Sequence, residues 1–210
     1  MSKCVIVLGM HRSGTSLVAG ILAQLGVDMG KKLLGANTFN PTGHWENVEV
    51  VDINTKILQA AGGDWKNVPS EKNILKCKKL FSQQIKQFIS SQKAEFWGFK
   101  DPRLCLTIPL WSKYLKNAFY VVVFRNPLQV AQSLNKRDRI DIKEGLRLTA
   151  IYNDRLTKFI SSINNPCLFL SFERIYPATV REIINFLKLR PSPKQIQKAE
   201  IFIDPELKYL

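Results

Sequence analysis

The segment Gly9–Ser16, which reads Gly-Met-His-Arg-Ser-Gly-Thr-Ser, holds the first group of residues that could do chemistry. Its glycine spacing matches the phosphate-binding loop G-x-x-x-x-G-K-[ST], whose backbone N–H groups hold phosphate oxygens at a helix N-terminus. Thr15 stands where that pattern has its lysine, and Arg12 supplies a cation inside the loop instead. Because the missing lysine spans the outer phosphates of ATP or GTP, ordinary triphosphate hydrolysis is disfavoured. The segment predicts an anion site, and a tight turn without a ligand is the alternative.

A second group of this kind lies around Arg125, which precedes Asn126 and Pro127 and is followed by Ser133 on the next expected helix. Arg125 comes at the end of the strongest strand pattern in the chain, and ligands of open parallel sheets bind at the carboxyl ends of strands. An arginine there can bind a phosphate group through two parallel hydrogen bonds, which lysine cannot do. The alternative is a surface arginine that caps a loop.

Candidates for proton transfer lie in and after the long segment 27–45, which is rich in glycine and proline. His44 and Glu46 flank Trp45 there. Lys100, which follows a short strand pattern later in the chain, and Arg12 are instead candidate cations that could stabilise negative charge as it develops in a reaction. A hydroxyl group that acts as a nucleophile must lose its proton to a base within hydrogen-bond reach. A long loop in a compact domain is usually functional, so it can carry such a base to the anion site.

These residues need elements that hold them, and the hydrophobic patterns predict alternating strands and helices. Strands are expected at 4–8, 96–99, 119–124 and 167–171, and helices at 15–25, 48–61, 70–91, from 127 onward, 142–163 and 179–187, with a helix broken at Pro109 over 104–115. Strands that alternate with helices indicate an α/β fold with a parallel sheet covered on both faces.

Taken together, the loop Gly9–Ser16 and the pair Arg125 and Ser133 resemble the sulfotransferases that use 3′-phosphoadenosine 5′-phosphosulfate (PAPS). The segment 40–46 resembles the acceptor-side loop of bacterial and carbohydrate-type members. Residues 100–102, Lys-Asp-Pro, resemble a motif of tyrosylprotein sulfotransferases, and residues 170–173 resemble a late strand of the family. The resemblance extends from Val5 to about Leu189.

This resemblance implies a single sulfotransferase domain over residues 1–210 with a P-loop NTPase-like fold. It implies transfer of a sulfuryl group from PAPS, leaving 3′-phosphoadenosine 5′-phosphate (PAP), to a hydroxyl group of a glycan, a lipid-linked sugar or a small alcohol or phenol. The donor residues it implies are Arg12, Ser13, Gly14, Thr15, Ser16, Arg125 and Ser133, and the catalytic residues are Glu46, Lys100, Arg12 and His44.

Several alternatives stay open within this assignment. Glu46 is the favoured base, His44 is the second candidate, and His11 is expected to pack or to touch the donor phosphate. Lys100 and Asp101 could form no more than an ion pair at a strand end, or Asp101 could resemble a magnesium ligand of an NTPase. The family's Gly-rich nucleotide motif has no counterpart in this chain, so the tail from Pro191 to Leu210 is expected to contact the adenine differently.

The composition limits which partners, metal sites and cellular location are expected. The net charge of +14, from 31 basic and 17 acidic residues, calls for an anionic partner. Four cysteines without a CxxC pair and two histidines predict buried thiols and no metal site. No apolar run is long enough for a signal peptide or a membrane span, so a cytoplasmic location is expected. A P-loop kinase is the main rival, and a nucleic-acid binder is supported by charge alone.

Overall fold

The computed structural model describes residues 2–204, and its centre is a sheet of four parallel strands. The strands lie in the order β2-β1-β3-β4 and are β1 (Lys3–Leu8), β2 (Phe96–Lys100), β3 (Ala118–Phe124) and β4 (Cys167–Ser171). The two central strands are almost wholly buried, as expected for apolar strands covered on both faces. The predicted α/β fold with a parallel sheet is therefore confirmed, with strand limits within about one residue of those expected.

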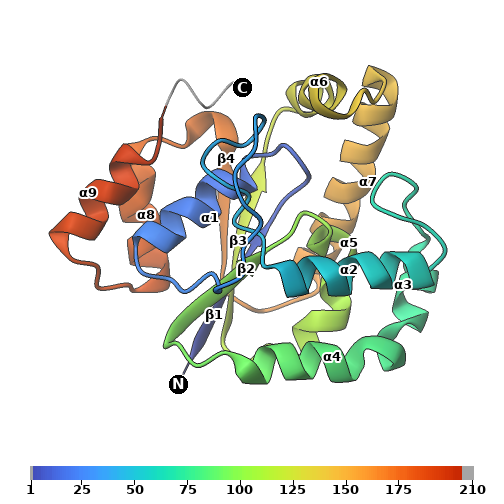
Figure 1. Ribbon diagram of the computed structural model, residues 1–210, viewed down its shortest axis with the longest axis horizontal. Helices are drawn as coiled ribbons and strands as arrows, with labels where there is room; N and C mark the ends of the chain where they lie inside the picture. The colour runs from blue at the N-terminus through green and yellow to red at the C-terminus, as the bar shows by residue number, and fades with distance from the viewer. Residues whose placement is uncertain (1, 205–210) are drawn as a thin grey trace.

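Helices cover both faces of the sheet, and Figure 1 shows the two layers on either side of it. One face carries α2 (Val48–Ala60), α3 (Glu71–Lys76), α4 (Lys78–Ser91), α5 (Leu104–Trp111), α6 (Pro127–Asp138) and α7 (Ile142–Ser161). The other carries α1 (Thr15–Gln24), α8 (Pro177–Leu187) and α9 (Pro193–Ile201). Short 3-10 turns span Ser112–Tyr114 and Phe172–Arg174.

Alternation along the strands divides the apolar core between these layers. Ile6 and Leu8 of β1 pack with the larger helical layer, whereas Val5 and Val7 pack with α1, α8 and α9. This is the period-two pattern of a strand with two buried faces. The parallel strands all end at the same edge of the sheet, so the segments that follow β1, β2 and β3 meet there.

Two helix predictions need correction. The helix expected over 70–91 is two helices, because Cys77 ends α3 and begins α4 with its backbone at the edge of the helical region. The helix expected to break at Pro109 runs through that proline to Trp111 and then tightens into the 3-10 turn. Proline removes one N–H group from the helix, and the tighter turn begins three residues later at Ser112.

Helix α9 is an element that the hydrophobic pattern did not predict. Ser192 caps its N-terminus, Pro193 occupies the first turn, and Gln195 completes a capping box with Ser192. These three residues are a recognised helix-start signal, so capping chemistry would have found the helix where periodicity did not. The buried Ala199 and Ile203 attach this part of the chain to the smaller layer.

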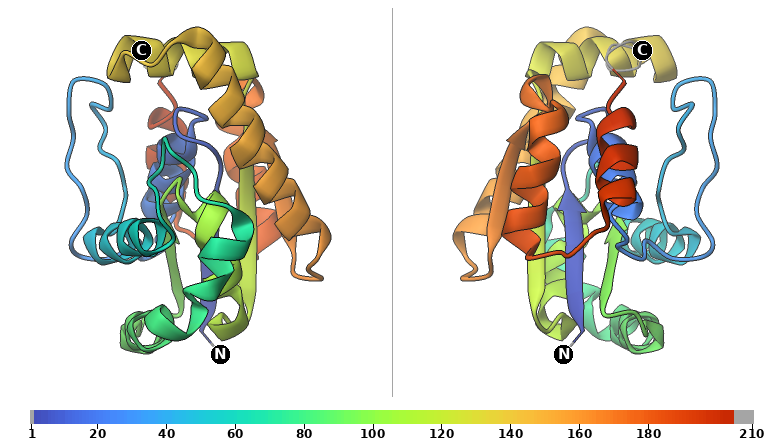
Figure 2. Two further views of the ribbon diagram at one scale, coloured as in Figure 1. Left: turned by 90° about the vertical axis from the view of Figure 1, so that its right-hand side faces the viewer. Right: turned by 90° about the vertical axis from the view of Figure 1, so that its left-hand side faces the viewer.

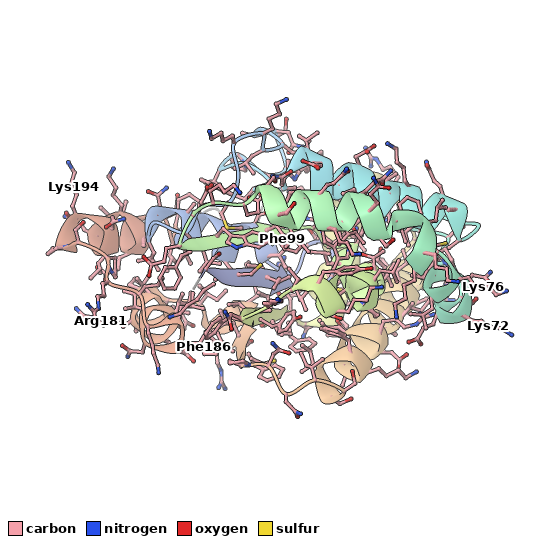
Figure 3. All side chains as sticks on the ribbon, turned by 90° about the horizontal axis from the view of Figure 1, so that it is seen from below. Lys72, Lys76, Phe99, Arg181, Phe186 and Lys194 are labelled. Carbon is pink, nitrogen blue, oxygen red and sulfur yellow. The ribbon has the colours of Figure 1, made fainter. Side chains whose placement is uncertain are left out.

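Part of the positive charge lies at opposite ends of the molecule. Figure 3 shows Lys72 and Lys76 at one end of the molecule and Lys194 at the other, all pointing outward. Such dispersed charges keep a protein soluble and do not by themselves define a binding face. Among the described helices, none is long and apolar enough to cross a membrane.

Candidate active site

A cleft opens where β1, β2 and β3 end, and it contains about 850 Å³ of empty space counted to its open mouth. Along the chain, the sheet grows from β1 to β2 on one side and then to β3 on the other. Ligands of open α/β sheets bind at such a reversal of strand order. The cleft is therefore the place to look for the predicted site residues.

The predicted donor loop, Gly9–Ser16, follows β1 and leads directly into α1. Gly14 precedes the helix with a φ of 92°, and Phe172 occupies the space that a Cβ atom would need there. Only glycine adopts this backbone conformation readily and tolerates so close a neighbour. Gly14, Thr15 and Ser16 line the cleft at the helix N-terminus, where backbone N–H groups and the helix dipole favour an anion.

Arg125 and Ser133 both contact the donor loop, although more than a hundred residues separate them from it. Arg12 donates a hydrogen bond from Nε to Ser133 Oγ at 2.7 Å. Arg125 donates from Nη1 to the backbone oxygen of Arg12 at 3.0 Å, and its guanidinium lies 4.4 Å from the centre of the Phe172 ring. Arg12 and Arg125, one from each group singled out in the sequence, thus line the same cleft. Within the described residues, Ser133 contacts Arg12 but does not itself line the cleft, and neither does Ser13, whose hydroxyl donates to the backbone oxygen of Met10.

Arg137 joins Arg12 and Arg125 at the cleft, and we call these three residues the arginine cluster. Burial, and to a smaller extent the charges of Arg137 and Arg125, lower the pKa of Arg12 to about 10. Asp138, which accepts a hydrogen bond from Arg137 Nε at 2.7 Å, partly offsets this repulsion. Neighbouring cations that repel one another make a site that an anion would stabilise.

Arg137 was missed by the sequence interpretation. It lies one helical turn after Ser133 on α6, so the i, i+4 spacing places both on one face of the helix. Extending the search by one turn from Ser133 would have found it.

The long segment between α1 and α2 reaches the same end of the sheet, where Figure 2 shows it as an extended strap beside the sheet. Arg12 donates from Nη1 to the backbone oxygen of Phe39 at 3.0 Å. Ser16 Oγ accepts a hydrogen bond from Asn40 Nδ2 at 3.0 Å and donates one to the backbone oxygen of His44 at 3.2 Å. These contacts hold the expected acceptor loop against the donor loop.

Glu46 and Lys100 meet at the base of the cleft, and we call them the buried pair. Lys100 Nζ lies 2.6 Å from Glu46 Oε1 and 3.1 Å from Ser16 Oγ, and only 1% of the Lys100 side chain is exposed. Burial lowers the pKa of Lys100, while the charge of Glu46 raises it in part. A buried ion pair of this kind needs good geometry and further hydrogen bonds, and Ser16 supplies one.

Lys100 and Asp101 form no ion pair with each other within the described residues, so that alternative is wrong. Asp101 Oδ1 instead lies 2.9 Å from Arg103 Nη1, and it accepts a hydrogen bond from the Arg103 backbone N–H at 3.0 Å. Consecutive residues at a strand end point in opposite directions, which separates the two side chains. Asp101 is fully buried behind the strand, so it does not face the cleft as a magnesium ligand of an NTPase would.

The two histidines occupy different places. His44 lines the cleft, its ring Nε2 lies 2.9 Å from Asn37 Nδ2, and burial lowers its pKa. His11 is buried at the cleft floor, with its ring 4.5 Å from that of Trp65 and 5.8 Å from that of Tyr152. Burial lowers the pKa of His11 far below its usual value, and four neighbouring cations act in the same direction. Both histidines are therefore neutral at pH 7.

Trp45, between His44 and Glu46 in the chain, does not line the cleft as they do. Its backbone has a φ of 56°, which turns the side chain away toward α1 and the Phe202 ring, 6.0 Å away. Phe202 and Asp204 line the cleft from the C-terminal side, so part of the tail does reach it. The rest of the tail, residues 205–210, lies outside the described residues.

The comparisons with known proteins agree with this geometry. The family model described as the sulfotransferase family matches residues 4–192. Among curated proteins, none matches the chain significantly.

Solved structures resemble the fold at low sequence identity. Sulfotransferase STF9 from Mycobacterium avium aligns over 96% of this chain and 68% of its own, with 17% identity and a TM-score of 0.58. The sulfotransferase domain of the Synechococcus PCC 7002 olefin synthase aligns over 92% and 76%, with 15% identity and a TM-score of 0.54. The sulfotransferase domain from the curacin biosynthetic pathway aligns over 93% and 77%, with 14% identity and a TM-score of 0.52.

The matched segment 4–192 contains the sheet and every site residue described above except the C-terminal Phe202 and Asp204. The similar structures share the arrangement of strands and helices over nearly the whole chain. This chain belongs to the sulfotransferase family.

Proposed function

We propose that the protein transfers a sulfuryl group from PAPS to a hydroxyl group of an acceptor. The observation that carries the proposal is the buried pair, because Lys100 bonds at once to Glu46 of the acceptor loop and to Ser16 of the donor loop. A cation at the boundary between a donor site and an acceptor site can stabilise charge that develops during transfer. A carboxylate beside it can take the proton that the acceptor loses.

The donor end of the cleft suits a nucleotide with two separate anionic groups. The backbone N–H groups around Gly14 and Thr15 supply one anion site at the N-terminus of α1. Arg125 and Ser133 supply a second site, which we assign to the 3′-phosphate of PAPS. When bound, PAPS supplies an activated sulfuryl group, and the arginine cluster offsets the charge of its phosphates.

The roles of the buried pair follow from its atoms. Glu46 Oε1 is held by Lys100, which leaves Oε2 to accept the proton of the acceptor hydroxyl. The bond from sulfur to the 5′-phosphate oxygen breaks as the bond from sulfur to the acceptor oxygen forms. Lys100 and Arg12 then stabilise the charge left on the departing phosphate oxygen. His44 lies on the acceptor side of the cleft, where we assign it to positioning the acceptor.

The donor assignment is tested by thermal unfolding with PAP and with ADP, which lacks the 3′-phosphate. A ligand that binds only the folded protein raises its melting temperature. We expect PAP to raise it clearly and ADP much less, because only PAP reaches Arg125 and Ser133. Equal shifts would contradict the PAPS assignment, and a larger shift with ADP and magnesium would favour the kinase.

A further inference from the structure

A network of buried polar side chains lies behind the buried pair and has no part in the function proposed so far. Its centre is Asn54 of α2, which is fully buried. Asn54 Nδ2 donates to Asp101 Oδ2 at 2.9 Å, whereas Asn54 Oδ1 accepts from Thr107 Oγ1 at 2.8 Å and from Trp111 Nε1 at 3.0 Å. Three hydrogen bonds therefore tie α2 to the segment after β2 and to α5.

The orientation of the Asn54 amide is fixed from both sides. The Trp111 indole N–H can only donate a hydrogen bond, so the amide oxygen must face it. The Asp101 carboxylate can only accept, so the amide NH₂ group must face Asp101. At neutral pH an aspartate at this position could accept from Trp111 but could not donate to Asp101. A leucine could neither accept nor donate a hydrogen bond. Asparagine at this position is chemically specified by its partners.

This network fixes the partner of Asp101. Both oxygens of the Asp101 carboxylate are engaged, Oδ2 by Asn54 and Oδ1 by the backbone and side chain of Arg103. Asp101 directly follows Lys100 in the chain and is close enough that its charge acts on the lysine. A carboxylate without these bonds would compete with Glu46 for the nearest buried cation.

We infer that Asn54 is a positioning residue that keeps the Asp101 carboxylate on Arg103, so that Lys100 stays bonded to Glu46 and Ser16 at the cleft. Asn54 and Glu46 belong to connected parts of the chain, since α2 begins two residues after Glu46. The same helix therefore places the base at its start and restrains the competing carboxylate from its middle. The inference rests on the proposed roles of Glu46 and Lys100.

The first experiment compares Asn54→Leu with the control Ile53→Val, a core truncation on the same helix. The readout is consumption of PAPS to PAP, with water or added alcohols as acceptor, together with PAP affinity and melting temperature. We expect Asn54→Leu to lower kcat tenfold or more while PAP affinity stays within about twofold, since the donor site is untouched. The control should lose some thermal stability and keep its kcat. A kcat for Asn54→Leu equal to that of the control would overturn the inference.

A second variant, Asn54→Asp, gives a signature that a purely structural role would not produce. It places two carboxyl groups side by side, and such a pair retains one proton to a raised pH. When the pair holds one proton, the new carboxyl group can donate the hydrogen bond that Asn54 gave to Asp101. When both carboxyl groups are ionised, they repel each other. The ratio of its kcat to that of the native protein should therefore fall as the pH rises from 5 to 9, while the ratio for Asn54→Leu stays flat.

The groups that face Asp101 are known, so this pH dependence can be assigned. Lys100, Arg103 and Glu46 lie around the carboxylate, with Cys105 and Tyr152 behind it. Burial raises the pKa of both Cys105 and Tyr152, so neither ionises between pH 5 and 9. A flat ratio for Asn54→Asp would count against the inference.

A readout independent of PAPS separates this inference from the proposed function. The side-chain NMR signal of the Lys100 ammonium group reports its partner, with Glu46→Gln as the reference for a lost ion pair. We expect Asn54→Leu to shift the signal in the same direction as Glu46→Gln. If PAP does not bind but the signal moves in this way, the positioning role stands and the proposed function fails. An unmoved signal overturns the positioning role whatever PAPS does.

Discussion

The two ends of the cleft differ in how their charges are balanced. The arginine cluster brings Arg12, Arg125 and Arg137 together, and their mutual repulsion helps to lower the pKa of Arg12. The buried pair instead matches one lysine with one carboxylate at 2.6 Å. An anionic ligand would stabilise the end of the cleft that has surplus positive charge. The buried pair is already electrically neutral and needs no ligand to balance its charge.

This contrast separates binding from chemistry. Arg125 and Arg137 of the arginine cluster should determine donor affinity and should matter less for the stability of the free protein, whereas Arg12 should affect both donor affinity and turnover. Residues of the buried pair should determine turnover and stability and should matter little for donor affinity.

The largest effect is expected from Lys100→Met, which leaves the Glu46 carboxylate buried without its cation. Breaking one side of a buried ion pair costs about 3–5 kcal/mol of folding free energy. The double variant Lys100→Met with Glu46→Gln should recover part of that loss, because no unpaired charge remains. Urea unfolding of the single and double variants measures this coupling. Losses that simply add would show that the two side chains do not act as a pair.

Next in size is the effect of Glu46→Gln on turnover. We expect kcat to fall about 10²-fold or more, the usual loss for a general base, while PAP affinity changes less than about twofold. Glutamine can still accept a hydrogen bond from Lys100 but cannot take a proton at neutral pH. His44→Ala, measured at the same PAP saturation, should cost less. If His44→Ala abolishes turnover and Glu46→Gln retains most of it, the assigned roles are reversed.

Donor affinity should respond to Arg125→Gln. The loss of a charged hydrogen bond to phosphate should weaken PAP binding about tenfold or more, with little change in ADP binding. Arg181→Gln on α8 is the matched control, since this exposed arginine lies away from the cleft. Isothermal titration with both nucleotides measures the difference. Equal losses for PAP and ADP would place Arg125 elsewhere than at the 3′-phosphate.

Acid should destabilise the protein through the buried His11 and the half-buried His44. The pKa of His11 lies well below 6.5 in the folded protein, and that of His44 is also lowered. Below pH 6.5 the unfolded chain binds protons that the folded protein does not, so the free energy of unfolding falls as the pH falls. The slope is at most about 1.4 kcal/mol per pH unit for each histidine.

Urea unfolding between pH 5.5 and 7 tests the histidine effect, with His11→Asn as the control. The control should show a shallower slope, because one of the two titrating groups is gone. A slope unchanged by His11→Asn would mean that another group titrates in this window.

The smallest effect is expected from metal removal. The described residues contain no cluster of three or more metal-binding side chains, and the arginine cluster can offset donor charge. We expect EDTA to leave PAPS consumption unchanged. Activity that EDTA abolishes and magnesium restores would favour phosphoryl transfer instead.

Local sequence signals predicted much of the fold. The strands came from apolar runs with β-branched residues, and the donor loop came from glycine spacing between a strand and a helix. Helix α9 could have been predicted from its capping residues Ser192, Pro193 and Gln195, which are equally local. The break between α3 and α4 at Cys77 could not have been predicted, because the helical pattern continues across it without a proline or glycine.

Backbone propensity and side-chain periodicity are local properties, so they were sufficient to predict the parallel α/β fold and the segments that follow its strands. The pairing of the buried charges, in contrast, depends on tertiary packing. Lys100 bonds to Glu46, 54 residues away, and its neighbour Asp101 bonds to Asn54 and Arg103. Partners of buried charges are chosen by the direction in which each side chain leaves the sheet and by the cost of leaving any charge unpaired. Both depend on how distant segments pack.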